Sequence, residues 1–372
     1  MHKWAAKALT VMLAAGGLQG IAVADPAWAC GCGAYIPGAN GTASVAREQA
    51  VVRFDGTTED VVMRFSVHSD APDAAWVMPV PGPGPAKTTL GDKDLFDQLS
   101  TAQEPLVKVH HYFLPHLSES GAKSGAGAPD NVGGPMAAAP TGAPVRVLSD
   151  QRIGAFEVAN LASADPKALG EWLEQHSFTL KAATAERLAA YTAQGWQFVA
   201  VRLASGSSAD LDGVLDPIRI SFPAKDAVYP MRLSAGATTP QHVELSVLAP
   251  HRMEIAQAPI AAHAAPSAFG DWIDPSRTGP ALANLAAGRM FLTVFDDAFE
   301  QPSQITQDYG FSPARSDWVQ HPVTYKEELL TFLGIPAYLL VVLALTGIGV
   351  VTVVRRGRRS VRRGRGAAHL AG

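Results

Sequence analysis

Cys30 and Cys32 are the residues of this chain best suited to redox chemistry without a cofactor. They are the two cysteines among 372 residues, and one glycine separates them. In an oxidising compartment, thiols this close can form a small strained disulfide, and strain makes a disulfide easier to reduce. The pair is therefore a candidate redox or disulfide site. Two alternatives stay open: acylation of Cys30 as in a lipoprotein, or free thiols or a metal site, for which two ligands alone are too few.

Histidines provide a second candidate chemistry, metal binding. His110, His111 and His116 form the densest histidine cluster of the sequence, and imidazole is a common ligand for zinc and copper. Adjacent residues of a strand point to opposite faces, so a strand would let only one of the first two join His116. We take His110 and His116 as the candidate metal pair. The alternative is that these are surface histidines, and we expect no cofactor.

A proline-rich segment is the candidate for recognition of a partner. Residues 75–78 are apolar enough for a strand, and prolines recur from Pro79 to Pro85. Proline lacks the amide donor that a central strand needs, so we expect the chain to leave the sheet here. Such a backbone is preorganised and loses little entropy on docking. The candidate contacts are Trp76, Met78, Pro79 and Pro81, and the alternative is a rigid strand exit packed on the core.

Acidic pairs are the last candidate for catalysis. Glu59-Asp60 and Asp296-Asp297 could serve as general acid and base, but that chemistry needs a shared cleft and perturbed pKa values. We expect these acids to lie on the solvated surface. The sequence contains no G-x-S-x-G elbow, H-E-x-x-H helix, P-loop or dinucleotide fingerprint. No motif therefore identifies a catalytic residue.

The N-terminal end has the pattern of a secretory leader. Lys3 and Lys7 precede an apolar core, and Ala22-Val23-Ala24 is a small-x-small cleavage signal. We expect residues 1–24 to be a signal peptide. The mature chain would then begin at Asp25.

The C-terminal end has the pattern of a membrane anchor. Residues 329–354 carry no charge, and an arginine-rich tail over 355–372 follows them. The run is long enough to cross a hydrocarbon core of about 30 Å, and basic residues favour the cytoplasmic side. We predict a single-pass plasma-membrane protein with an extracytoplasmic N-terminal domain and a cytoplasmic tail. The residues assigned to this anchor are Arg355, Arg356, Arg358 and Arg359.

The charge of the segment between these ends excludes one class of partner. Removing the two leader lysines and the seven tail arginines from 30 basic residues leaves 21 against 34 acidic ones. A nucleic-acid-binding domain needs a basic surface. We therefore expect no nucleic acid, and name the membrane and an envelope protein as the partners.

The pattern of elements predicts an α+β fold of mainly antiparallel sheet with a few short helices, plus one C-terminal transmembrane helix. Residues 50–54 and 61–67 predict a hairpin with one dry face, since apolar and polar residues alternate along the second strand. Similar alternation predicts strands at 218–222 and 243–247. The predicted segments are an ectodomain half at 25–117, a flexible linker rich in Gly, Ala and Pro at 118–144, a second half at 145–299, and a polar stalk at 300–328.

Several of these segments resemble a known family. They include Cys32 to Tyr35, Ala75 to Pro81, Leu95 to Leu99, Gly195 to Ala200 and Tyr229 to Ser234. In this order they resemble a bacterial envelope family known as domain of unknown function 2330. The resemblance covers residues 30–255 and implies a leader, an ectodomain and a frequent C-terminal anchor. It implies no activity.

The sequence supports two functional hypotheses. The first is a membrane-anchored, non-catalytic binding or assembly module of the bacterial cell envelope. The second is an envelope enzyme, hydrolytic or thiol-dependent, whose site no motif reveals. A deep pocket that collects ionisable residues would favour the enzyme, and a shallow apolar or proline-lined face would favour the module.

Overall fold

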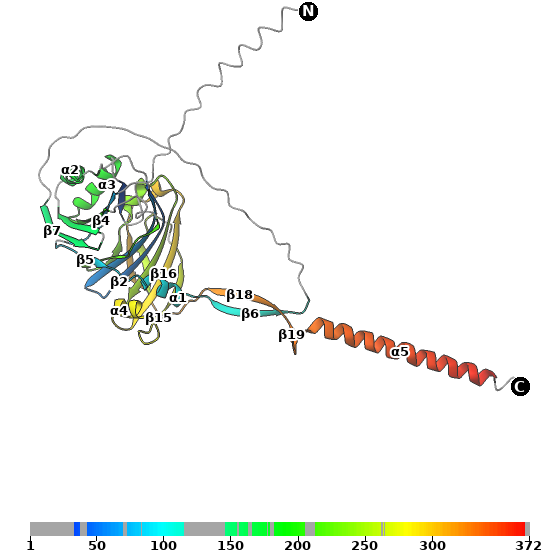
Figure 1. The fold of residues 1–372 in the computed structure, drawn as a ribbon. Helices are drawn as coiled ribbons and strands as arrows, with labels where there is room; N and C mark the ends of the chain where they lie inside the picture. Colours follow the sequence, from blue (N-terminus) through cyan, green and yellow to red (C-terminus); the bar gives the residue numbers. More distant parts are fainter. Residues whose placement is uncertain are drawn as a thin grey trace, which may run out of the picture. The chain divides into compact units, whose positions relative to one another are not determined.

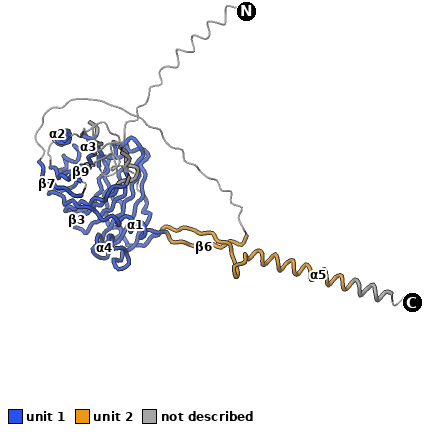
Figure 2. Tube along the Cα trace, viewed as in Figure 1, with its two compact units in different colours: residues 1–104, 128–321 blue, residues 105–127, 322–372 orange. Residues whose placement is uncertain are grey.

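The computed structural model describes residues 33–37, 43–69, 73–82, 84–114, 146–154, 156–162, 166–176, 178, 182–204, 213–261, 263 and 265–368. The chain divides into two units (Figure 2), one formed within 1–104 and 128–321 and the other within 105–127 and 322–372. The predicted signal peptide at 1–24 and the linker predicted at 118–144 lie outside the described residues.

The first unit is built on a large eight-stranded sheet. Its strand order is β15-β16-β13-β2-β3-β11-β5, and β10 pairs with β3 beside β11. All neighbours are antiparallel except β13 and β2, which are parallel. The strands are β2 Ala43–Phe54, β3 Thr58–Ser69, β5 Lys87–Leu90, β10 Gly213–Val214, β11 Ile218–Pro223, β13 Gln241–Ala249, β15 Ser267–Ile273 and β16 Met290–Phe299.

Two smaller sheets complete the strands of this unit. The five-stranded sheet has the order β1-β4-β9-β8-β7, and the three-stranded sheet has the order β12-β17-β14. The first comprises β1 Ala34–Pro37, β4 Asp73–Val80, β7 Arg146–Ile153, β8 Phe156–Ala162 and β9 Gln197–Ala204. The second comprises β12 Ala227–Tyr229, β14 Met253–Gln257 and β17 Tyr309–Pro313.

Helices cover the outer faces of the large and the five-stranded sheets (Figure 1). Apolar residues of α1 and α4 pack with one face of the large sheet, and those of α2 and α3 pack with the outer face of the five-stranded sheet. Between the large sheet and the two smaller sheets lies the central core, which includes Trp76, Val61 and Tyr309. The helices are α1 Leu95–Ala102, α2 Pro166–Gln175, α3 Ala182–Thr192 and α4 Pro280–Ala286, with 3-10 turns η2 Arg232–Gly236 and η3 Pro302–Gln304.

The hairpin predicted at 50–67 is present, but its second strand does not have one dry face. Val61 and Met63 point into the central core, while Val62 lies in the core under α1 and α4. All three are buried. The single-face prediction is wrong over this stretch because the large sheet is covered on both sides. The turn itself is tight, and Gly56 supplies the positive φ of 95° that it needs.

The strand before the prolines extends further than predicted. β4 pairs with β9 through Pro79 and Val80, opposite Phe198 and Gln197. Its pairing with β1 ends at Val77. At Pro79 the strand therefore has a described neighbour on one side only, and a residue without an amide donor is tolerated at such an edge.

The two predicted ectodomain halves are not separate bodies. β2 lies between β3 and β13, and β4 lies between β1 and β9, so strands from both sides of the linker alternate within each sheet. The stalk predicted at 300–328 is also wrong over its first part. Ile305, Tyr309 and Phe311 are buried in the central core, and β17 is the middle strand of the three-stranded sheet, paired with both β12 and β14.

The second unit is a two-stranded ladder, a small hairpin and a long helix. β6 Leu106–Tyr112 pairs in parallel with β18 Val323–Leu329, and β19 Thr331–Phe332 pairs with β20 Ile335–Pro336. The helix α5 runs Ala337–Ala368. Residues 337–359 of α5 are long and apolar enough to cross a membrane, and none of their most apolar stretch is buried by the described chain. The helix thus begins eight residues later than the predicted 329.

This architecture confirms the predicted fold class. The sheets are mainly antiparallel, the helices of the first unit are short, and the apolar helix lies at the C-terminal end.

Candidate functional site

A cleft opens on the outer face of the five-stranded sheet, beside the C-terminal end of α2. Its cavity volume is about 70 Å³, several times the roughly 10–15 Å³ that one water molecule needs. Strands β4, β9, β8 and β7 form the floor, and α2 with the residue Phe178 forms the wall. The lining residues are Ala75, Asp150, Glu157, Ala159, Trp172, Leu173, His176, Phe178, Ala200, Val201 and Arg202.

Alanines make the floor of this cleft hollow. Ala159 of β8 and Ala200 of β9 are direct register partners, and Ala75 of β4 lines the same floor. Residues opposite each other in a sheet share a face and sit about 5 Å apart. Three methyl groups therefore occupy an area that larger side chains would fill. Elsewhere on this face Phe198 and Leu161 are buried in the core under α2 and α3.

The wall is aromatic and is braced by the helix end. The Trp172 and His176 rings stack with their centroids 4.0 Å apart. The His176 Nδ1 donates to the Trp172 carbonyl oxygen at 2.7 Å, which also accepts the His176 amide at 3.3 Å. The Phe178 amide donates to the Leu173 carbonyl at 2.9 Å. These bonds hold the end of α2 and the residue Phe178 in place.

Charges of both signs lie at the rim. Arg202 of β9 is paired in register with Glu157 of β8, and its Nη1 lies 3.3 Å from a Glu157 carboxylate oxygen. Asp150 on β7 is the register partner of Ala159 on β8. Both members of the ion pair are about two-fifths exposed, so water screens it and its contribution to stability is small. The rim can instead hydrogen-bond a polar group of a ligand.

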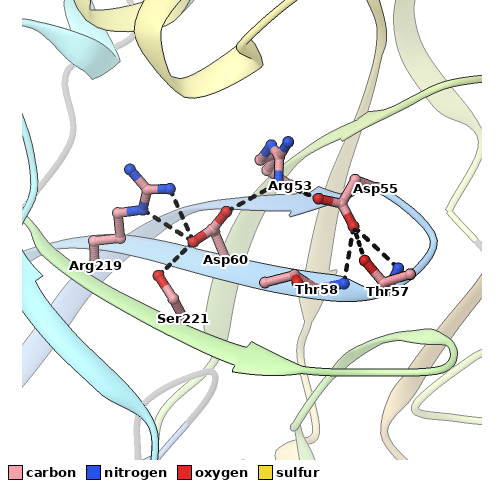
Figure 3. Close-up of polar contacts among 7 residues, drawn as sticks. All are labelled: Arg53, Asp55, Thr57, Thr58, Asp60, Arg219 and Ser221. Atoms are coloured by element: carbon pink, nitrogen blue, oxygen red, sulfur yellow. Dashed lines mark hydrogen bonds and ion pairs between the residues drawn. The ribbon is translucent and has the colours of Figure 1, made fainter.

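A second polar cluster lies on the other side of the unit, around Asp60 (Figure 3). Asp60 on β3 is the register partner of Arg53 on β2 and of Ser221 on β11. Arg53 Nη1 lies 3.3 Å from its Oδ2, Arg219 Nη2 lies 2.9 Å from its Oδ1, and the Ser221 hydroxyl donates to the same Oδ1. The Asp60 side chain is only 3% exposed. A buried carboxylate with this many partners is a structural group.

The turn beside this cluster is held by Asp55. Its carboxylate accepts hydrogen bonds from the Thr57 amide at 3.0 Å, the Thr57 hydroxyl at 2.8 Å and the Thr58 amide at 2.9 Å. Partial burial raises the pKa of Asp55, but the hydrogen bonds from Thr58, Thr57 and Arg53 outweigh burial and hold the pKa well below its usual range. The charged form of Asp55 therefore stabilises the β2–β3 hairpin.

Glu59 differs from its neighbour Asp60 because it faces the central core. Its register partners are Phe54 and Phe222, and it is fully buried. Burial raises the pKa of Glu59 well above its usual value, against the lowering effect of a hydrogen bond from the Val228 amide at 3.0 Å. Its Oε1 has no hydrogen-bond partner among the described residues. Of the acids that sequence places on the surface, Glu59, Asp60 and Asp297 are in fact buried.

Two tyrosines connect the three-stranded sheet to the large sheet. Tyr229 and Tyr309 are register partners on β12 and β17. The Tyr229 hydroxyl donates to Glu48 on β2, and the Tyr309 hydroxyl donates to Asp297 on β16 at 2.6 Å. Burial, followed by the nearby Asp297 carboxylate, raises the pKa of Tyr309. The half-exposed His263 lies 2.8 Å from Asp297 through its Nε2, so Asp297 has a partner on each side.

A third tyrosine joins α3 to the segment before β17. The Tyr191 hydroxyl donates to Asp308 at 2.5 Å, and the Met231 amide donates to the same oxygen at 2.7 Å. Arg232 donates to the other oxygen through Nε at 2.8 Å, and its guanidinium lies 3.9 Å from the centre of the Tyr191 ring. Burial and the Asp308 charge raise the pKa of Tyr191. Each of these buried acids thus holds two elements together.

The residues singled out from sequence do not converge on one site. Cys30, Cys32 and His116 lie outside the described residues, and His110 is exposed on β6. Among the described residues no group of three metal-binding side chains occurs. Arg355, Arg356, Arg358 and Arg359 are exposed on α5, beyond its most apolar part.

The recognition candidates also need correction, because most of them are not at the surface. Trp76 is 1% exposed and Met78 is 0% exposed, both in the central core. Pro79 is buried and Pro81 is half-buried. The apolar side chains of β4 alternate between the central core and the floor under α2, so the strand has no free face. The alternative interpretation, a strand exit packed on the core, describes these residues.

The model of DUF2330, an uncharacterized protein conserved in bacteria, matches residues 26–312. The chain belongs to this family. The sequence resemblance is therefore confirmed. The matched DUF2330 region includes the cleft, β17 up to its penultimate residue and the buried acids Glu48, Glu59, Asp60, Asp297 and Asp308. It leaves out β18 and α5.

Comparison with other proteins adds little to this DUF2330 assignment. No curated protein sequence matches the chain. Among solved structures, the crystal structure of baculovirus P35 is similar over 76% of this chain and 98% of its own, at 10% identity and a TM-score of 0.28. A mutated baculovirus P35 after caspase cleavage is similar over 75% and 100%, at 8% identity and a TM-score of 0.29. TM-scores this low do not establish a shared fold.

Sequence reasoning missed the cleft. Its floor is three alanines from strands far apart in the chain, and alanine is too common to mark a site. Trp172 is visible in sequence as part of an amphipathic helix, which predicts that it packs on the core. It does pack partly on the core under α2 and α3, and it also lines the cleft.

Proposed function

We propose that this DUF2330 protein is a membrane-anchored binding module of the bacterial cell envelope. In this proposal α5 spans the plasma membrane, the first unit lies outside the cytoplasm, and the arginine tail lies inside it. The α2 cleft holds a side chain or short segment of an envelope protein partner. The observation that carries the proposal is the cleft itself, whose hollow alanine floor and aromatic wall form a site shaped for contact.

The buried ionisable groups support binding over catalysis. Asp60, Asp297 and Asp308 each accept hydrogen bonds from two or more partners on different elements. These bonds consume the acceptor positions that a general base would offer to a substrate. The charged residues at the rim of the cleft include an ion pair. Among the described residues that line the cleft, no nucleophilic side chain lies beside a base. The enzyme alternative has no comparable support.

The proposed partner is tested by cross-linking from the rim of the cleft. A photoreactive phenylalanine analogue replaces the exposed Asp150 in the full chain in cells, and a matched control places it at the exposed Glu254 on β14. We expect an adduct from position 150 and none from 254. Adding Ala200→Leu, which fills the floor, should abolish the adduct while a thermal melt shows that the variant is folded. An adduct that persists in the folded Ala200→Leu variant would contradict the proposal.

The proposed orientation has an independent test. A reporter that is active only in the cytoplasm, fused after Gly372, should be active. Protease added outside wall-stripped cells should degrade the first unit. Basic residues at one end of a span set its orientation, so reversed results would mean that the tail faces outward.

A further inference from the structure

The segment between the ladder and the helix exposes four large apolar side chains. Leu333 is 89% exposed and Phe332 is 65% exposed, with Ile335 at 44% and Leu330 at 41%. Leaving a large apolar side chain in water is unfavourable. Four such side chains in so short a segment are a substantial cost in water, and a cluster of this kind indicates contact with a lipid or protein surface.

This segment is folded into a defined hairpin. Phe332 pairs with Ile335 and Thr331 with Pro336, and the turn holds Leu333 at a φ of 51° and Gly334 at 78°. The Leu330 amide donates to the Tyr112 carbonyl at 2.8 Å, and the Ala337 amide donates to the Leu330 carbonyl at 2.8 Å. The hairpin is therefore hydrogen-bonded to the ladder at one end and to the first residue of α5 at the other. Its apolar tip is held beside the start of the helix.

The length of the apolar helix brings this tip to the membrane surface. Residues 337–354 of α5 precede the first arginine, and at 1.5 Å per residue they span about 27 Å. A hydrocarbon core is about 30 Å thick, so Ala337 must lie at its boundary. Leu333 is four residues away, and an extended chain of that length reaches at most about 14 Å. The tip cannot leave the vicinity of the interface.

The charge pattern favours lipid as the occupant. Residues 329–336 carry no charge, whereas Lys326 and Glu328 on the adjoining strand form an exposed ion pair at 2.8 Å. Charged side chains remain in water, whereas apolar side chains next to a membrane span can enter the lipid. Tyr338 follows at the start of α5, and tyrosine is enriched at membrane interfaces.

We propose that the hairpin 330–336 is seated in the lipid interface, with Phe332 and Leu333 inserted as a wedge that fixes the helix and the ladder at the membrane surface. This inference rests on the proposed function only in taking α5 as the membrane span. It assigns a membrane-binding role to residues outside the helix. The ladder then begins at the level of the lipid headgroups.

Spin labels in the full chain test this placement. In a chain carrying Cys30→Ser and Cys32→Ser, single cysteines replace Leu333, the ladder residue Glu327, and Leu345 in the helix. Each is labelled with a nitroxide, and the protein is placed in phospholipid nanodiscs. We expect the labels at 333 and 345 to relax with oxygen, which partitions into lipid, and the label at 327 to relax with a water-soluble nickel complex.

The outcomes separate this inference from the anchor itself. If the label at 345 is in lipid and that at 333 responds to nickel as strongly as that at 327, the wedge is wrong and the anchor stands. A label at 333 shielded from both reagents, or broadened by a second label, would mean that protein covers the hairpin, which also overturns the inference. If the label at 345 is in water, α5 is not a span and both proposals fail.

Discussion

Glu59 and Asp60 show how one step along a strand decides the chemistry of a carboxyl group. Asp60 faces two arginines and a serine, which all hydrogen-bond to its carboxylate. Glu59 faces two phenylalanines in register and has one amide donor. Neighbouring side chains of a strand point to opposite faces, so the same acidic pair is split between two environments. The two positions therefore predict different effects of substitution.

Replacing Glu59 with glutamine should change how stability depends on pH. Because burial raises the pKa of Glu59 above its usual 4.5, the folded chain keeps a proton that the unfolded chain loses between those two pKa values. In that window the wild type loses about 1.4 kcal/mol of stability per pH unit, and Glu59→Gln does not. We expect the unfolding free energy of the variant, relative to wild type, to rise as pH increases above 4.5.

Urea unfolding at pH values from 4 to 8 measures this difference. Glu254→Gln, at an exposed position on β14, is the matched control and should track the wild type at every pH. A Glu59→Gln variant whose relative stability is flat across the series would show that Glu59 is charged in the folded chain.

Removing the Asp60 carboxylate should be far more costly than removing a surface acid. Asp60→Ala leaves Arg53 and Arg219 close together without the anion between them, and breaking a buried ion pair in this way costs about 3–5 kcal/mol. Asp97 provides the control, because it also meets an arginine, Arg64, at 3.4 Å but is 81% exposed. Asp97→Ala should cost less than about 1 kcal/mol. Denaturant unfolding at neutral pH should show this contrast, and equal costs would refute the structural role of Asp60.

Sequence could not assign these roles to individual residues. The overall acidity of the chain favours solvated acids, and Asp296, half exposed beside His242, is one. Its neighbour Asp297 is buried because β16 presents it to Tyr309 and His263. The partner that buries each acid comes from another strand, and no local pattern specifies it.

At the level of elements, one buried acid links α3 to two other segments of the first unit. Asp308 accepts the Tyr191 hydroxyl and the Arg232 guanidinium, so it links the helix, η2 and the segment before β17. Hydrogen bonds to a charged group contribute about 1.5–3 kcal/mol each. The segment that carries Asp308 is therefore part of the fold and not a connection to the membrane.

Tyr191→Phe should destabilise the first unit by about 2 kcal/mol, because the phenyl ring keeps the packing and loses the hydrogen bond. Hydrogen exchange should rise first in α2 and α3, which pack together in one core. Tyr325→Phe is the control, since Tyr325 is 66% exposed, and it should leave exchange unchanged. If the Tyr191→Phe variant instead loses exchange protection uniformly across all three sheets, α2 and α3 do not open separately from the rest of the unit.

Elements with regular patterns could be predicted, and those defined by distant partners could not. Ile218, Ile220 and Phe222 alternate with polar residues, and all three are buried as the pattern indicates. Tyr309 and Phe311 follow the same alternation, but Pro302 and Pro313 bracket a stretch rich in polar residues, which favours an irregular segment. The strand β17, which contains Tyr309 and Phe311, is central only because it pairs with both β12 and β14.

At the scale of the whole chain, the three cores draw no described residue from the second unit. Every member of the central core and of the two helix-covered cores lies before residue 312. The DUF2330 match ends at the same point. The first unit therefore contains the apolar contacts that it needs to fold, and the second unit contributes the candidate span.

Two truncations test this division of the chain. A mature chain ending at His321 lacks β18 and α5 but keeps β17 with Tyr309 and Phe311, so we expect a soluble protein whose melting temperature is close to that of the full chain in detergent. A chain ending at Thr306 is only 15 residues shorter but loses Asp308 and the centre of the three-stranded sheet. It should fail to fold, because Tyr191 and Arg232 lose their shared acceptor and the central core is opened. Calorimetry of both truncated chains measures whether each one melts as a folded protein. A folded chain ending at Thr306 would support the polar stalk that the sequence predicts from residue 300.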